Sequence, residues 1–173
     1  MVLPLKPKRG GFLRPFGCGA FIRQFLMGNE PFGSPPIHPE IGAPQTDIFY
    51  WYKMARLWFT AIERAIRQEE RLAKREERGI SPDNIAEIAE KTVKRIPWKS
   101  NGCRYHSFVT YFSNLQRLGW VEESGIEERS SLQEHYPEGQ PRRFYRLTDA
   151  GKAATESAWA DPYGALYGRD KPK

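Results

Sequence analysis

Cysteine is scarce in this sequence. Only Cys18 and Cys103 occur among 173 residues, and they stand too far apart to suggest a metal-binding pair or a disulfide framework. We therefore expect two free thiols and a reducing, cytoplasmic setting. The three histidines are scattered, and none stands in a pattern typical of zinc sites. No metal is expected.

Long hydrophobic runs are also missing. No apolar stretch approaches the roughly 20 residues that a membrane helix requires, and no apolar signal-peptide core follows Met1. We expect no membrane partner. An organelle transit peptide is an alternative for the first residues, which contain arginine and no acid before Glu30, although no serine precedes Ser34.

Glycine-rich phosphate loops of the Walker or dinucleotide type are absent from the sequence. Gly10-Gly11 and Gly17-Cys18-Gly19 lie in an irregular segment, without the strand and helix that such loops connect. No spacing of side chains points to a nucleophile with its base. We expect no catalytic residues, no cofactor and no enzymatic activity.

Basic residues exceed acidic ones. The chain has 27 lysines and arginines against 21 acids, a net charge of +6 and a sequence pI near 9.4. This balance favours polyanionic partners. The alternative is a basic surface that serves only solubility.

Residues 1–46 are predicted to be an irregular basic and aromatic extension, because glycine and proline are dense there and only 20–27 shows a short period. Ser34 to Pro39 is expected to be an extended linker. Cations interleaved with rings suit a nucleic-acid arm, and a protein-binding tail or plain disorder are equal alternatives. The cations and rings are Lys6, Lys8, Arg9, Arg14, Arg23, Phe12, Phe16, Phe21 and Phe25.

Residues 47–78 form the strongest predicted helix, capped by Asp47 or Thr46 and ended by Gly79. Its first half is apolar over more than one stripe, which predicts a homodimer interface at Trp51, Ala55, Trp58 and Ile62. A monomer whose N-terminal segment covers this face is the alternative. The second half is mostly charged, with favourable four-residue pairs Glu63–Arg67 and Glu70–Lys74.

Two further helices follow. Ser81 caps the first, Pro82 occupies its first turn, and Pro97 stops it. Residues 98–102 are predicted to be the turn of a helix-turn-helix pair. The second helix spans 103–118, where Phe108, Phe112, Leu115 and Leu118 recur at three- and four-residue steps and predict a buried stripe.

A hairpin is predicted after this helix. Gly119 suits a left-handed cap, 120–123 and 143–147 have strand composition, and Thr148 or Asp149 caps a last helix to Ala154. A helix followed by two strands and another helix is typical of the back half of a winged helix. The predicted fold is therefore mainly α with a small two-stranded β wing.

The runs Leu115-Gln116-Arg117-Leu118-Gly119-Trp120-Val121-Glu122 and Tyr145-Arg146-Leu147-Thr148-Asp149-Ala150-Gly151 resemble winged helix-turn-helix DNA-binding regulators of the MarR and PadR type. The resemblance covers roughly the last two-fifths of the chain, and the wing, 124–142, is longer than a simple turn. It implies a winged-helix domain at 47–160 between the extension and a tail at 161–173. It also implies duplex DNA binding, transcription regulation and a dimer made by the long helix.

The helix at 103–118 is the predicted DNA-reading element. Its outer face is polar and almost uncharged, which suits base edges, whereas cations at its start and in the wing suit phosphates. An ordinary solvated face is the alternative, and the glutamates at 127, 128, 134 and 138 argue against a DNA-gripping wing. The rival function is an interaction or architectural subunit whose N-terminal tail enters a protein or RNA partner. The candidate residues are Lys99, Arg104, Tyr105, His106, Ser107, Thr110, Asn114, Arg117, Arg142 and Arg143.

Overall fold

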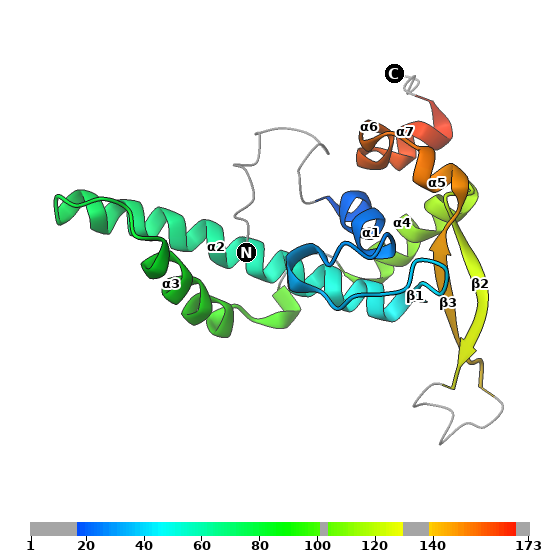
Figure 1. Ribbon diagram of the computed structural model, residues 1–173, viewed down its shortest axis with the longest axis horizontal. Coiled ribbons are helices and arrows are strands. Elements are labelled where there is room, and N and C mark those ends of the chain that lie inside the picture. Colours follow the sequence, from blue (N-terminus) through cyan, green and yellow to red (C-terminus); the bar gives the residue numbers. More distant parts are fainter. Residues whose placement is uncertain (1–16, 101–103, 130–138, 169–173) are drawn as a thin grey trace. The chain divides into compact units, whose positions relative to one another are not determined.

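The computed structural model describes residues 17–100, 104–129 and 139–168. The chain is mainly helical, with a small antiparallel sheet (Figure 1). It divides into two compact units. The first contains the segments up to Tyr52 and from Arg104 onward, and the second contains Lys53 to Cys103. This division differs from the expected domain limits at 46 and 160.

The first unit is built around the sheet and helix α4. Its elements are α1 (Cys18–Leu26), the 3-10 turn η1 (Pro31–Gly33), β1 (Ala43–Pro44), the start of α2 (Gln45–Arg75), α4 (Tyr105–Arg117), β2 (Val121–Glu128), β3 (Arg142–Leu147), α5 (Asp149–Ala153), α6 (Glu156–Ala160) and α7 (Pro162–Tyr167). The helix predicted at 103–118 is thus confirmed over 105–117, and its buried stripe at Phe108, Phe112 and Leu115 is fully inaccessible.

The prediction of a two-stranded sheet was wrong. The described residues form three strands in the order β1-β3-β2, with both pairs antiparallel. β1 has only two residues, too few to show a period in the sequence. Gly42 allows it to approach β3, because its φ is 74° and a Cβ there would overlap the carbonyl oxygen of Tyr145.

Part of the predicted irregular extension is instead core. Helix α1 buries Phe21, Ile22, Phe25 and Leu26, each at most 2% exposed. Phe21 packs on Tyr52 of α2 with 5.5 Å between ring centroids. Aromatic residues interleaved with cations therefore form, over this segment, a short amphipathic helix that fills the core. The remaining basic and aromatic residues before Gly17 lie outside the described residues.

The end of the chain also differs from the prediction. The tail expected at 161–173 contains α7, and Asp161 caps this helix by accepting a hydrogen bond from the backbone N–H of Gly164 at 2.9 Å. Trp159 of α6 is 1% exposed, and its ring lies 4.9 Å from that of Trp120. Its indole N–H donates to the carbonyl of Gly151 at 2.9 Å. The helices at the end of the chain thus belong to the core of the first unit, where α6 packs on α1 and α7 on α4.

The second unit contains most of α2, then α3 (Pro82–Arg95) and the 3-10 turn η2 (Trp98–Ser100). Ile62 and Ala65 of α2 pack with Ile85 and Ala89 of α3 in a small aliphatic core. Trp58, Ile66 and Ile88 pack at the edge of this core. α3 was predicted as the first half of a helix-turn-helix pair, but it belongs to this unit, whereas α4 belongs to the first.

Helix α2 begins at Gln45, two residues before the predicted start at 47, and ends at Arg75, three residues before the predicted end at 78. Asp47 is therefore no cap. It lies in the first turn, where a carboxylate favours the positive end of the helix dipole. Beyond Arg75 the chain turns at Glu77, whose φ is 50°. Ser81 caps α3 as predicted, accepting from the backbone N–H of Asn84 at 3.3 Å.

A buried carboxylate closes the α2–α3 hairpin. Glu69 is fully inaccessible and accepts from two guanidinium nitrogens of Arg78, at 2.5 and 3.2 Å, and from the backbone N–H of Ser81 at 2.9 Å. The amide of Asn84 donates to its second oxygen at 3.4 Å. The hydrogen bonds from Arg78 and Ser81 lower the pKa of Glu69 to about 2. The carboxylate is therefore a charged structural clasp.

None of the helices within the described ranges is both long enough and apolar enough to span a bilayer.

Candidate nucleic-acid interface

Helix α4 is held in the first unit by aromatic contacts from the first two turns of α2. The ring of Phe49 lies 5.2 Å from Phe108 and 5.1 Å from Tyr105, and Tyr52 stacks 6.4 Å from Phe108. Phe112 continues this row to Tyr145 of β3, with centroids 5.1 Å apart. The helix packed against α4 in its own unit is thus α2, where the sequence predicted α3.

The outer face of α4 is where the sequence predicted it. His106, Ser107, Thr110 and Arg117 are exposed, and Asn114 is half-buried. Thr110 donates its hydroxyl to the carbonyl of His106 at 3.1 Å and keeps its acceptor lone pairs outward. The face is therefore a set of neutral donors and acceptors, opposite the buried phenylalanines.

The start of α4 contains two more of the predicted residues. Arg104 is the N-terminal flanking residue, exposed and extended in backbone conformation, with no side-chain cap. Tyr105 is 45% exposed although one edge of its ring contacts Phe49. Lys99 is exposed on η2, which belongs to the second unit, whereas α4 belongs to the first.

The C-terminal end of α4 is partly covered by α7. Arg117 donates to the hydroxyl of Tyr167 of α7 at 3.2 Å, and the ring of Tyr163 is tilted against that of Tyr167 with 4.6 Å between centroids. Tyr111 is mostly buried beside Gly19, and this burial raises the pKa of its hydroxyl. The face available to a large ligand therefore runs from His106 to Asn114.

The arginines of β3 are neutralised by carboxylates. Arg142 pairs with Asp47 at 2.7 Å, and Arg143 pairs with Glu123 at 3.0 Å and Glu127 at 3.8 Å. The hydrogen bond to Glu123 raises the pKa of Arg143. An arginine so paired must break an existing contact before it can bind phosphate.

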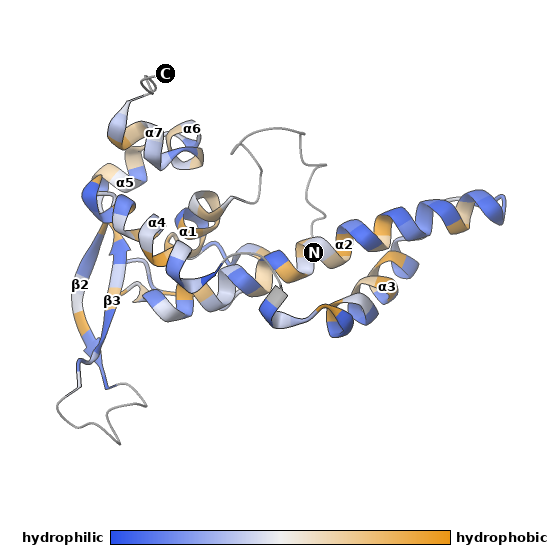
Figure 2. Cartoon of the chain, turned by 180° about the vertical axis from the view of Figure 1, so that it is seen from behind, coloured by the Kyte–Doolittle hydropathy of each residue, from blue (hydrophilic) through white to orange (hydrophobic). Residues whose placement is uncertain are grey.

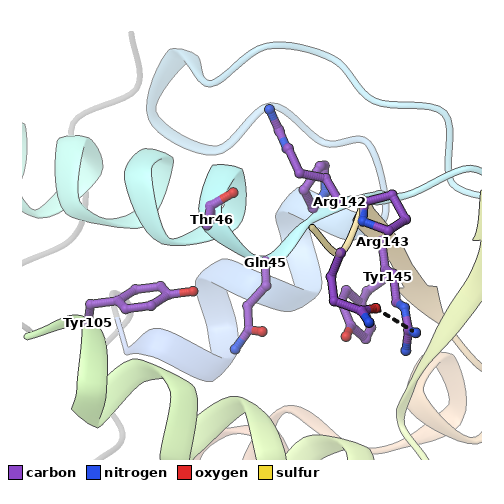
Figure 3. Close-up of a pocket in the computed structure, with 9 residues that line it drawn as sticks. Gln45, Thr46, Tyr105, Arg142, Arg143 and Tyr145 are labelled. Carbon is purple, nitrogen blue, oxygen red and sulfur yellow. Dashed lines mark hydrogen bonds between the residues drawn. The ribbon is translucent and has the colours of Figure 1, made fainter. Parts of the chain in front are cut away.

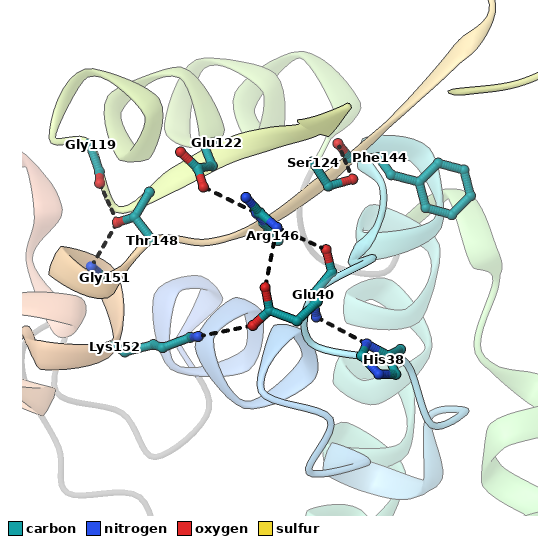
Figure 4. A network of polar contacts seen from close by, with 10 residues as sticks. All are labelled: His38, Glu40, Gly119, Glu122, Ser124, Phe144, Arg146, Thr148, Gly151 and Lys152. Carbon is teal, nitrogen blue, oxygen red and sulfur yellow. Dashed lines mark hydrogen bonds and ion pairs between the residues drawn. The ribbon is translucent and has the colours of Figure 1, made fainter. Parts of the chain in front are cut away.

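Arg146, which the sequence analysis did not select, is the centre of a further network (Figure 4). It contacts Glu122 at 3.1 Å and Glu40 at 3.2 Å, and Lys152 reaches the other oxygen of Glu40 at 3.6 Å. In the strand register Glu122 lies opposite Arg146 and Glu127 lies opposite Arg143, which is a cross-strand pattern of opposite charges. The sequence contains this signal, but only the strand register reveals it.

One cavity of about 300 Å³ lies beside this sheet, at the start of α2 (Figure 3). Its lining includes Gln45, Thr46, Tyr105, Tyr145 and both arginines at the start of β3. Those arginines already contact Asp47 and Glu123, so the cavity offers a ligand little uncompensated charge. Within the described ranges no three His, Cys, Asp or Glu side chains come together as a metal site would require.

The predicted dimer residues are partly used within the chain. Ala55 and Ile62 are each 2% exposed, and Ile62 belongs to the core shared with α3. Trp51 and Trp58 are half-buried, and Trp58 packs against that core. The wide apolar surface of α2 is therefore largely covered by the chain itself.

Comparison of the chain with protein-family models, with curated proteins and with solved structures gave no match.

Proposed function

We propose that the first unit is a winged helix-turn-helix module that binds duplex DNA through the outer face of α4 and regulates transcription. The observation that carries this proposal is the set of hydrogen-bonding side chains between His106 and Asn114, on a helix whose opposite face is fully buried. Such groups can donate to and accept from base edges in the major groove.

The surrounding elements support a winged helix. α4 is followed directly by the antiparallel hairpin β2–β3 and then by α5, and β1 extends the sheet beside β3. The first turns of α2 contact α4 through Phe49 and Tyr52, and they supply the partner helix. In this arrangement residues 53–103 are an insertion between the two helices of the motif.

Substitution of the outer face tests the proposal. His106→Ala and Asn114→Ala should each weaken binding to a duplex selected from a random pool by about 1–3 kcal/mol, with little effect on unselected duplex. The matched control is Ser157→Ala, an exposed polar residue on α6. Fluorescence anisotropy with both duplexes measures the difference. Equal affinities of all three variants and the parent chain for the selected duplex would refute groove reading by α4.

A second candidate function has its own observation. In the described part of the first unit acids outnumber bases, and the β3 arginines are paired, which favours a role as an interaction subunit over DNA gripping by the wing. In that case the basic N-terminal residues would enter RNA or a partner. Loss of binding to single-stranded RNA after deletion of residues 1–16, with no duplex binding by the full chain, would support this function.

A further inference from the structure

The second unit carries an exposed row of cations that the described part of the first unit lacks. Lys and Arg side chains recur along α2 at steps of three and four residues, which places them on one face of the helix. All of them are exposed, and the opposite face holds the buried Ile62, Ala65 and Ala73. Most of this part of α2 is hydrophilic (Figure 2). The row, called the α2 cation row below, is Arg64, Arg67, Arg71, Lys74 and Arg75.

These cations are not neutralised within the described chain. Several cations elsewhere are paired, among them Arg78 with Glu69, Lys91 with Glu87, and Arg146 with Glu122. By contrast, no member of the row has an ion pair or side-chain hydrogen bond with any residue in the described ranges. The helix pairs expected at Glu63–Arg67 and Glu70–Lys74 are not formed.

We infer that the α2 cation row binds the phosphate backbone of duplex DNA. From Arg64 to Arg75 the helix rises about 16 Å, a length over which duplex DNA presents about ten phosphate charges. Four of the five members are arginines, whose guanidinium forks bind phosphate oxygens in pairs.

The chemistry of the row favours a phosphate chain over other acidic partners. Between Arg64 and Arg75 the other exposed residues are Gln68 and Glu70, and none is aromatic or aliphatic. A protein partner or a membrane surface would be expected to need such an apolar anchor. Binding by the row is independent of groove reading by α4, because it uses no residue of the first unit. It would also supply the phosphate contacts for which the paired β3 arginines are poorly suited.

A salt series on the full chain tests this inference. Arg67→Gln/Arg71→Gln should make the slope of log affinity against log salt shallower by about two for a short duplex of random sequence. Each phosphate contact releases about 0.9 counterion from the DNA on binding, and the variant loses two such contacts. Arg67→Lys/Arg71→Lys should keep the slope of the parent chain. Glutamine and lysine are both good helix formers, so circular dichroism should show α2 intact in all variants.

The matched control removes the same charge from paired positions. Lys91→Gln/Lys152→Gln takes away two cations that are held by Glu87 and Glu40, and it should leave the slope nearly unchanged. Equal slopes for both glutamine pairs would overturn the inference, because net charge and not the row would then set binding. The two proposals separate cleanly. If only the α4 variants lose the preference for the selected duplex, the inference about the α2 cation row is unaffected. If only the row variants lose salt slope, the proposal of groove reading by α4 is unaffected.

Discussion

The two units place their charges in opposite ways. The first unit has a core of aromatic rings and pairs its arginines with carboxylates at the surface of the sheet. The second unit has a small aliphatic core, buries one carboxylate beneath Arg78, and leaves a row of cations in water. The net charge of +6 therefore says little about where a polyanion binds. The pairing of each cation says much more.

The largest expected effect concerns the aromatic core of the first unit. Phe25→Ala should destabilise the protein by about 3–5 kcal/mol, because a fully buried ring leaves a cavity that the neighbours fill only in part. Denaturant unfolding followed by circular dichroism measures this. Met27→Ala, two residues later and 36% exposed, is the matched control and should change little. A small effect of Phe25→Ala would mean that α1 is not part of this core.

Next comes the buried carboxylate of the second unit. Glu69→Gln should lower the Tm by several degrees, because Arg78 and Ser81 lose a charged acceptor. The exposed neighbour in Glu70→Gln is the matched control and should leave the Tm nearly unchanged.

The pH dependence sharpens this test. The pKa of Glu69 is lowered to about 2 in the folded chain, so its contribution is complete above the ordinary glutamate value of about 4.3 and is lost as the pH falls toward 2. The difference in Tm between the parent chain and Glu69→Gln should therefore shrink over this acid range. If the difference in Tm stays constant from neutral pH to pH 2, the charged form of Glu69 does not stabilise the α2–α3 hairpin.

A smaller effect is expected at Trp58, which decides between a core and a dimer contact. Because it packs at the edge of the core with Ile62 and is half-buried, Trp58→Ala should cost about 2 kcal/mol of unfolding free energy. Light scattering measures the oligomeric state in parallel. A parent dimer that dissociates on Trp58→Ala, with no loss of monomer stability, would restore the predicted interface.

The smallest expected effect is at the wing. Arg143→Gln removes an exposed cation already paired with Glu123, so it should change stability little and leave the salt slope for duplex DNA almost unchanged. A loss of one unit of slope would show that Arg143 leaves its carboxylates for phosphate. The first unit would then also supply a cation to the DNA backbone, and pairing with carboxylates would not distinguish the two units.

The sequence predicted the local elements well and their partners poorly. Periodicity located α4 and α3, and turn chemistry located the cap at Ser81 and the left-handed Gly119, whose φ is 69°. These features depend on neighbours within about four residues. Which helix packs on α4 depends instead on Phe49, and this contact has no local signature.

The candidate site shows the same limit. The helical wheel correctly predicted that His106 and Thr110 are exposed, because the buried stripe on one side of the helix defines the opposite face. Charge alone then selected Arg142 and Arg143 as phosphate ligands. Their partners, Asp47 and Glu123, come from a distant helix and from a strand register that composition does not reveal. Two of the unpaired cations of α2, Arg67 and Lys74, were predicted to form helix pairs with Glu63 and Glu70 that the structure does not contain.

The contact between Glu40 and Arg146 joins residues 106 positions apart in the chain, and the whole second unit lies between them. Closing so long a loop is slow, because its entropy is lost before the contact forms. The second unit shortens that search, since Lys53 near its beginning lies 4.9 Å from the Trp98 ring near its end. We therefore expect the α2–α3 hairpin to fold first. If so, Ile85→Ala should slow refolding more than Leu147→Ala does at equal loss of stability, because the second unit acts as a folding nucleus for the sheet whose strands precede and follow it in sequence.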